Sequence, residues 1–143
     1  MSHVIIHTDG ACKGNPGPGG WGAWLRSGTH EKELWGGEAH TTNNRMEITA
    51  AIEGLLMLPP GSKVQIFTTS DYLFQGITQW IRGWRKRNWV KKDGEQPVAN
   101  ADLWQALDKL SENYKIRWIN AKGQSLAGLE EAGKLAANAV RVV

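Results

Sequence analysis

The chain has 143 residues, of which 41% are hydrophobic and 22% are charged, and its formal net charge is +3. These proportions are typical of a soluble globular protein, so we expect one domain over residues 1–143. No apolar run approaches the roughly 20 residues of a membrane-spanning helix, and residues 1–10 lack the features of a secretory signal peptide. Cys12 is the only cysteine, which excludes an internal disulfide and a cysteine-based zinc site. We therefore expect a cytoplasmic protein, monomeric and without membrane contact.

Positive charge is concentrated between Ile81 and Lys92. This stretch holds six of the 17 basic residues and none of the 14 acidic ones, so the remainder of the chain is net negative. A solvated helix face is the simpler interpretation of such a run. However, Trp84 and Trp89 alternate with these cations, and aromatic rings can stack on bases while cations neutralise phosphates. The pattern therefore favours a polyanionic partner.

The predicted elements are three strands followed by alternating helices and strands. Strands are expected over 3–8, 22–25 and 33–36, with a glycine-rich turn over 10–20 and a second turn around 27–29. A helix over 42–58 ends at Pro59-Pro60. Next come a strand over 64–68, a helix capped by Ser70 or Asp71, a helix over 102–110, a strand over 115–120 and a helix over 126–140. This order predicts an α/β fold with a mixed sheet flanked by helices.

Four motifs, in a characteristic order and spacing, indicate a family. They are Thr-Asp-Gly at 8–10 with Gly-Asn-Pro-Gly-Pro-Gly-Gly at 14–20, Thr-Thr-Asn-Asn-Arg-Met-Glu at 41–47, Gln-Gly-Ile-Thr-Gln-Trp-Ile at 75–81 and Asn-Ala-Asp-Leu-Trp at 100–104. Through them the chain resembles bacterial type 1 ribonuclease H across nearly its whole length. The resemblance implies a ribonuclease H-like fold with a five-stranded mixed sheet whose first three strands are antiparallel. It also implies cleavage of the RNA strand of an RNA–DNA hybrid with two magnesium ions.

The resemblance makes Asp9 and Glu47 the expected catalytic and metal-binding residues, because they match the family's first two carboxylates. Two divalent ions that clamp one phosphate need hard oxygen ligands from several converging segments. Asp9 follows the first predicted strand, and Glu47 lies one turn into the first long helix, so both can face one site. Considered alone, each is more simply interpreted as a helix-capping or solvated acid, whereas within these motifs the ligand interpretation is favoured. The expected cofactor is Mg²⁺, or Mn²⁺, and it is expected to bind weakly.

The family's other two carboxylates are missing. With Tyr72 setting the register, Thr69 stands where the third would be, and the apolar pair Leu135-Ala136 places Gly133 at the fourth. Neither residue supplies the charge that holds a divalent ion. The histidine that the family carries in the preceding loop is Gln124 here. Acids at the start of the last helix could substitute, although complementing the helix dipole is their simpler role; they are Glu130 and Glu131.

The hybrid-binding residues, in contrast, match the family. Asn15, Asn43 and Asn44 correspond to residues that meet the minor groove of the hybrid, where amides can both donate to and accept from 2′-hydroxyls. Asp71 aligns with a hybrid-contacting position that is usually glutamine. The remaining expected contacts are with phosphates and the DNA strand, from Thr42, Arg45, Trp80, Arg85, Lys86 and Arg87. The basic and aromatic segment over 80–92 resembles the family's basic protrusion, which grips the DNA strand, and Trp84 and Trp104 are expected to pack its base.

Three hypotheses follow. The first is a hybrid-binding protein of the ribonuclease H fold whose RNA cleavage is weak or lost. The second is an active metal-dependent endoribonuclease that uses Asp9, Glu47 and an unorthodox third ligand. The third is an interaction module whose protrusion contacts another protein. The missing carboxylates favour the first over the second, and the matching asparagines favour the first over the third.

Overall fold

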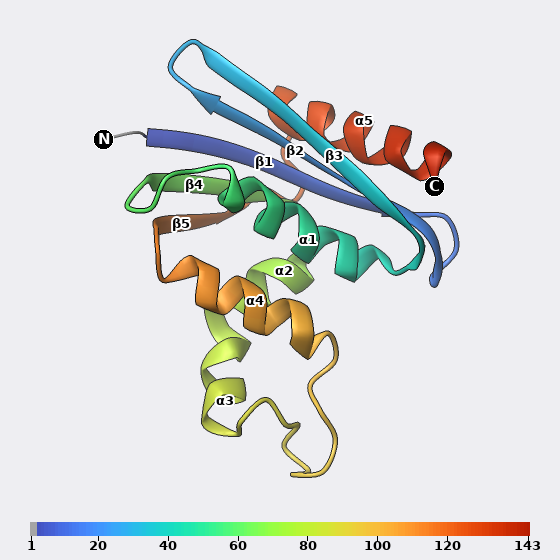
Figure 1. The fold of residues 1–143 in the computed structure, drawn as a ribbon, viewed down its shortest axis with the longest axis vertical. Coiled ribbons are helices and arrows are strands. Elements are labelled where there is room, and N and C mark those ends of the chain that lie inside the picture. Colours follow the sequence, from blue (N-terminus) through green and yellow to red (C-terminus); the bar gives the residue numbers. More distant parts are fainter. Residues whose placement is uncertain (1–2) are drawn as a thin grey trace.

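The computed structural model describes residues 3–143 and contains one mixed sheet with helices on both faces (Figure 1). The strands are β1 (His3–Cys12), β2 (Gly17–Ser27), β3 (His30–Thr41), β4 (Lys63–Thr68) and β5 (Lys115–Asn120). They lie in the order β3-β2-β1-β4-β5. Strands β1 to β3 are antiparallel, whereas β4 runs parallel to β1 and β5. The expected five-stranded mixed sheet is confirmed.

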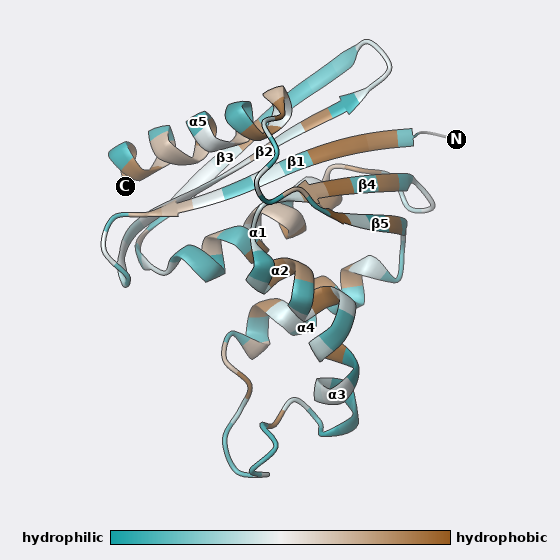
Figure 2. Ribbon diagram, turned by 180° about the vertical axis from the view of Figure 1, so that it is seen from behind, coloured by the Kyte–Doolittle hydropathy of each residue, from teal (hydrophilic) through white to brown (hydrophobic). Residues whose placement is uncertain are grey.

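The helices form two layers. They are α1 (Asn43–Leu56), α2 (Asp71–Gln75), the π-helical turn η1 (Gly76–Trp80), α3 (Ile81–Lys86), α4 (Ala101–Ser111) and α5 (Ala127–Val142). Helix α1 packs on β1 and β2 and against α4, while α5 lies across β1, β2 and β3 on the opposite face. Seen from that side, β4 and β5 have no helix over them (Figure 2). Within residues 3–143, no helix is both long and apolar enough to cross a bilayer.

The expected glycine-rich turn over 10–20 is wrong in extent. Strand β1 continues to Cys12 and β2 begins at Gly17, so most of those glycines pair within the β1–β2 ladder. The reason is close packing of a helix. A Cβ atom at Gly20 would lie 2.4 Å from the Ala136 carbonyl oxygen, and one at Gly22 would lie 2.3 Å from that of Ala132. Glycine is used here because the α5 backbone approaches the sheet closely.

The core lies between the sheet and α1. Along β1 the side chains alternate, and Val4, Ile6 and Thr8 are buried, as expected for a strand with one covered face. Ile48 of α1 and Ile66 of β4 belong to the same fully buried core. This packing brings the carboxyl-terminal half of β1 alongside the first turns of α1, which is where Asp9 and Glu47 lie.

Candidate active site and nucleic-acid interface

Asp9 on β1 and Glu47 on α1 are brought together by a close approach of their backbones. A Cβ atom at the intervening Gly10 would lie only 2.8 Å from the Glu47 backbone nitrogen. Any side chain at that position would therefore push the helix off the strand. The Gly10 N–H donates to Asp9 Oδ1 at 2.9 Å, which fixes one carboxylate oxygen. The structure thus places both expected carboxylates at one site.

The two carboxyl groups are poorly solvated. Glu47 is 4% exposed and its Oε1 has no hydrogen-bond partner. Burial, and then the nearby Asp9 charge, raise the pKa of Glu47 well above its usual value. Burial also raises the pKa of Asp9, against a smaller opposing effect of the Gly10 N–H. A buried acid without a partner costs stability, and a bound cation would remove that cost.

Positions 69 and 133 both border this pair. Thr69 directly follows the last residue of β4. The last pair of the β1–β4 ladder is His7 with Phe67, so extending both strands by two residues places Asp9 beside Thr69. A Cβ atom at Gly133 on α5 would lie 3.0 Å from Asp9 Oδ2. A carboxylate at position 133 would therefore meet Asp9, and one at position 69 would lie beside it where the β1–β4 ladder is extended.

A third acidic ligand does not join the pair. Among residues 3–143 no group of three or more histidine, cysteine, aspartate or glutamate side chains is placed to hold a metal ion. Glu130 is exposed in the first turn of α5, and Glu131 forms a 3.5 Å ion pair with Lys134. Gln124 is also exposed, in the loop before α5. In this conformation none of them supplements Asp9 and Glu47.

The asparagines expected to meet the hybrid come from two segments that touch. Asn15 Oδ1, in the bend between β1 and β2, accepts from the Asn43 N–H at 3.0 Å. Asn44 is the next residue, and Thr42 caps α1 by accepting from the Arg45 N–H at 3.2 Å. Thr42 therefore has a structural role in addition to its expected phosphate contact. Asn15 and Asn43 are exposed, so this edge is free to contact a ligand.

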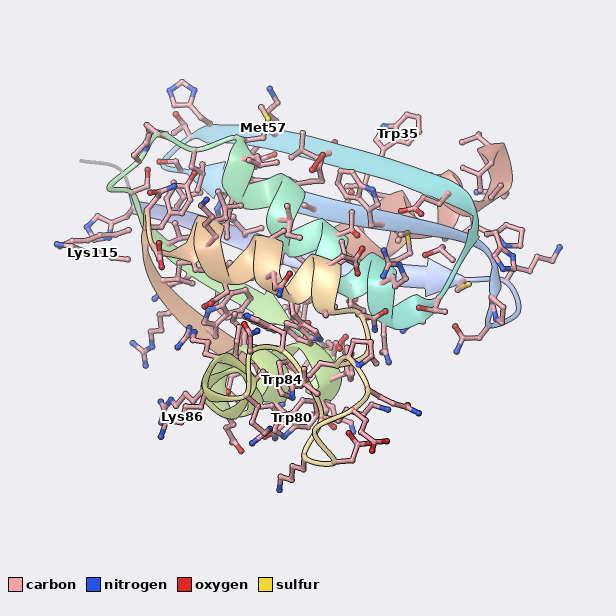
Figure 3. The ribbon with its side chains drawn as sticks, turned by 60° about the horizontal axis from the view of Figure 1, so that its bottom comes forward. Trp35, Met57, Trp80, Trp84, Lys86 and Lys115 are labelled. Carbon is pink, nitrogen blue, oxygen red and sulfur yellow. The ribbon has the colours of Figure 1, made fainter. Side chains whose placement is uncertain are left out.

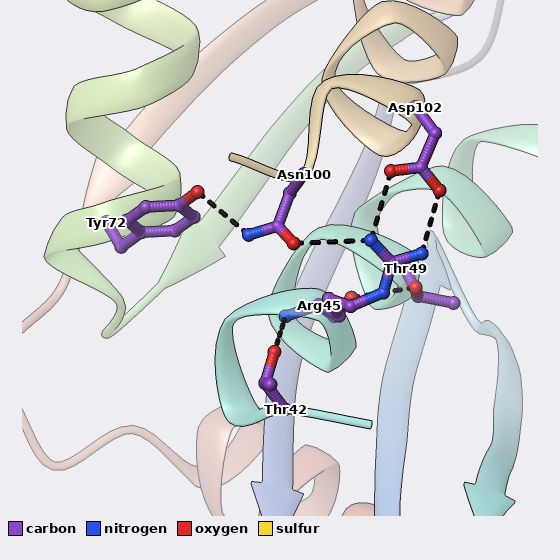
Figure 4. A network of polar contacts seen from close by, with 6 residues as sticks. All are labelled: Thr42, Arg45, Thr49, Tyr72, Asn100 and Asp102. Atoms are coloured by element: carbon purple, nitrogen blue, oxygen red, sulfur yellow. Dashed lines mark hydrogen bonds and ion pairs between the residues drawn. The ribbon is translucent and has the colours of Figure 1, made fainter. Parts of the chain in front are cut away.

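Arg45 connects that edge to the rest of the molecule (Figure 4). Its guanidinium donates to both oxygens of Asp102, at 3.0 and 2.8 Å, and to Asn100 Oδ1 at 3.2 Å. Asn100 Nδ2 in turn donates to Tyr72 Oη at 3.0 Å. This chain of contacts joins the start of α1 to α2 and α4. The sequence motif at 100–104 signalled it, but its role as an anchor for Arg45 becomes visible only in the structure.

Asp71 is exposed at the start of α2 and is already paired. Lys122 Nζ lies 2.6 Å from Asp71 Oδ2, and Asn120 Nδ2 donates to Oδ1 at 2.9 Å. Hydrogen bonds from Lys122 and then Asn120 lower the pKa of Asp71. The carboxylate is thus tied to the end of β5 and the loop after it, and a hybrid contact by Asp71 would compete with this ion pair.

The protrusion, defined here as residues 71–100, is built around a cluster of tilted aromatic rings. Trp104 of α4 is fully buried and donates from Nε1 to Tyr72 Oη at 3.1 Å. Trp84 lies between Trp104 and Trp80, with ring centroids 5.3 and 6.0 Å away. Trp80 is the outermost of the three and is 41% exposed (Figure 3). The expected packing of Trp84 and Trp104 at the base is confirmed, and Trp80 is left available to a ligand.

The cations of the protrusion are not equivalent. Arg85 forms a two-pronged ion pair with Asp108 of α4, so it helps attach α3 to the domain. Lys86 is exposed and forms no ion pair among the residues that the structure describes. Arg87 is half-buried and donates to the Val90 carbonyl at 3.4 Å. Of the three expected contacts, Lys86 is the least constrained.

The fold and the matched sequence identify the family. The RNase H family model matches residues 1–141. The chain belongs to the ribonuclease H family. It is 54% identical over 137 residues to a ribonuclease H of Methylobacillus flagellatus, covering 94% of this chain and 90% of the relative. With a ribonuclease H of Dechloromonas aromatica it shares 59% over 124 residues, covering 85% and 82%. These relatives place it with the bacterial type 1 enzymes.

Solved ribonuclease H structures superpose on this chain. LC9-RNase H1, a type 1 RNase H with the type 2 active-site motif, superposes with a TM-score of 0.84 at 28% identity, covering 99% of this chain and 74% of that one. LC11-RNase H1 in complex with an RNA/DNA hybrid gives a TM-score of 0.65 at 22% identity, covering 97% of each chain. The second likeness concerns the fold alone.

Proposed function

We propose that this protein binds RNA–DNA hybrids and cleaves their RNA strand weakly or not at all. The observation that carries the proposal is that, among residues 3–143, only two carboxylates, Asp9 and Glu47, meet at the site, while the neighbouring positions hold Thr69 and Gly133. Hybrid binding is supported by family membership and by the exposed Asn15–Asn43 edge beside the Arg45 anchor. The exposed ring of Trp80 adds a stacking surface.

The donor set suits one divalent cation better than two. Asp9 and Glu47 offer hard oxygens, and the unpartnered Glu47 Oε1 is the type of atom that a cation would satisfy. Mg²⁺ is commonly held by one or two carboxylates together with substrate phosphate. A bound Mg²⁺ would polarise the phosphate and neutralise developing charge. Two ions bridged by shared carboxylates would need ligands that Thr69 and Gly133 do not provide.

An active enzyme is the second candidate, and one observation favours it. The buried, unpartnered Glu47 Oε1 marks a place where a cation would be bound even without the usual third ligand. Glu130 lies three residues before Gly133 on α5, hence near the same helix face, and is exposed. A rotation of its side chain could bring it toward the site. In that case hybrid cleavage would depend on Glu130 as well as on Asp9.

The deciding experiment combines binding and cleavage on one labelled hybrid. Binding is measured by fluorescence anisotropy without metal, and cleavage by gel electrophoresis in Mg²⁺ and then in Mn²⁺. We expect hybrid binding, tighter than binding to duplex DNA of the same sequence, together with very slow or undetectable cleavage. Robust cleavage that is abolished by Asp9→Asn and by Glu130→Gln would establish the second candidate instead. Equal affinity for hybrid and duplex DNA would contradict hybrid recognition.

A further inference from the structure

Four basic residues gather on the part of the sheet that α5 leaves uncovered. They are Arg26 of β2, Lys63 of β4, and Lys115 and Arg117 of β5, and we call them the sheet-face cations. The ladders place Arg26 and Arg117 in one row across the sheet. From β2 to β5 this row runs Arg26, Ile5, Gln65, Arg117. Lys63 and Lys115 pair directly in the next row on the same face.

This arrangement is unfavourable for stability. Like charges directly opposite each other on neighbouring strands destabilise a sheet, yet Lys63 faces Lys115. All four side chains are exposed, and within residues 3–143 none of them forms an ion pair. Even Glu31, the partner of Arg26 in the β2–β3 ladder, makes no ion pair with it. Their charge is therefore available to a ligand.

The cations surround a hollow of about 740 Å³ whose lining includes no acidic residue. Its floor is formed by the strand backbones with the half-buried side chains of Ile5 and Gln65. The hollow lies at the start of β1, β4 and β5, whereas Asp9 and Thr69 lie toward or beyond the opposite ends of their strands. Figure 3 shows Lys115 far from Trp80 and Trp84. A duplex held at the asparagine edge and protrusion would leave this hollow free.

We propose that the sheet-face cations form a second nucleic-acid site, which binds a short stretch of single-stranded DNA or RNA through its phosphates. A hollow of this volume is in the range of small-molecule sites, so it suits a few flexible nucleotides and not a rigid duplex. The apolar and amide floor can contact sugars and bases while the cations contact phosphates. The cations span the sheet from β2 to β5, so they can contact successive phosphates of one nucleic-acid strand.

The test uses a fluorescein-labelled oligodeoxythymidylate of about 10 nucleotides, within the usual site size of single-strand-binding folds. Anisotropy is recorded with the parent protein and with Lys63→Glu/Lys115→Glu, each with excess unlabelled hybrid to occupy the protrusion. The matched control is Lys32→Glu/Lys109→Glu, which makes the same charge change at exposed residues outside both basic surfaces. We expect the first double variant to weaken oligonucleotide binding at least about tenfold and the control to change it little. Hybrid affinity, measured separately, should be equal in both.

Two outcomes would overturn the proposal. In one, Lys63→Glu/Lys115→Glu and Lys63→Gln/Lys115→Gln both bind the oligonucleotide as tightly as the parent protein does. The glutamine variant is included because charge reversal could disturb folding. The other is tighter, Lys63- and Lys115-dependent binding of a polyglutamate peptide that displaces the oligonucleotide, which would assign the hollow to an acidic protein. This site goes beyond hybrid binding and does not depend on it. If the parent fails to bind hybrid, the titration without competitor still tests the hollow.

Discussion

Gly133 on α5 directly faces Asp9 on β1: a Cβ atom at position 133 would lie 3.0 Å from Asp9 Oδ2. This is a tight contact, and it means that the side chain at position 133 decides what the Asp9 carboxylate meets on that side. With glycine there, Asp9 meets no ligand and no counter-charge from α5. The same geometry shows how a carboxylate could be returned to the site.

The first prediction follows from that contact and concerns cleavage. Thr69→Asp should raise Mg²⁺-dependent hybrid cleavage, and Thr69→Asp/Gly133→Asp should raise it further, because ligands of a shared ion act together. Alanine suits a helix better than glycine, so Gly133→Ala is the matched control, and it should leave cleavage at the parental level. Initial rates on a labelled hybrid provide the measurement. No rise in either aspartate variant would contradict the assignment of these positions.

The aspartate variants should also show a stability cost that metal removes. Gly133→Asp brings a third acid against Asp9, whose pKa is already raised by burial, so repulsion should lower the melting temperature in a chelator. Added Mg²⁺ should restore it, because a ligand that binds only the folded state stabilises it. Gly133→Ala should respond much less to Mg²⁺. Calorimetry with and without the ion separates the two contributions.

The second prediction concerns Glu47 and stability. Its folded-state pKa is raised by burial and by Asp9, so the ionised form penalises the fold once the pH rises above the unfolded-state pKa. Glu47→Gln should therefore stabilise the protein at neutral pH, by about 1–3 kcal/mol, and the gain should vanish as the pH falls through the acidic range. Urea unfolding at several pH values measures it. Glu95→Gln, at an exposed residue of the protrusion, should show no such pH-dependent gain.

The third prediction concerns His7. This residue stacks on Phe67 with centroids 4.8 Å apart, and its buried Nδ1 has no partner. Burial, and then Arg26, lower the pKa of His7 below its usual value. Its neutral form therefore supports the fold above about pH 6.5, and stability is lost as the pH falls from there through the folded-state pKa. His7→Phe should flatten that decline in a melting-temperature profile; an unchanged slope would rule His7 out as its source.

The fourth prediction separates the cations of the protrusion. Lys86→Ala should weaken hybrid binding and reduce the salt dependence of affinity by about one phosphate contact. Arg85→Ala should act differently, because it leaves Asp108 without its partner; it should change protrusion stability by about 1 kcal/mol or less. Filter binding across a salt series, with melting curves on the same variants, distinguishes the two. If hybrid affinity depends on salt equally in the parent and in Lys86→Ala, then Lys86 does not contact a phosphate of the hybrid.

The fifth prediction concerns stacking by Trp80. Trp80 is 41% exposed, and its ring packs against that of the less exposed Trp84, so Trp80→Ala should cost about 1–3 kcal/mol of hybrid binding. Trp35, which is 57% exposed on β3, provides the matched control, and Trp35→Ala should bind hybrid like the parent. Equal losses in both variants would indicate a general effect of losing a surface tryptophan.

Local sequence signals were sufficient for most elements. Lys115–Asn120 alternates as a strand should and is β5 as predicted, and Pro59-Pro60 ends the first helix close to the predicted point. The extent of β1 and β2 was not predictable in this way, because Gly20 belongs to a glycine-rich stretch that is typical of a turn. Its presence in a strand depends on α5 packing against it, which is a contact between segments more than 100 residues apart.

The sequence by itself determined the family, the mixed sheet and the presence of only two matching carboxylates, because motif spacing and hydrophobic periodicity are local properties of the chain. Only the tertiary structure decided which charges are free. Arg85 and Asp71 are paired with Asp108 and Lys122, partners that no local pattern indicates. The same holds for the sheet-face cations, which three separate stretches of sequence contribute and which strand pairing alone brings to one face. Electrostatics depends on distance in space, and the chain sets that distance only once the strands have paired.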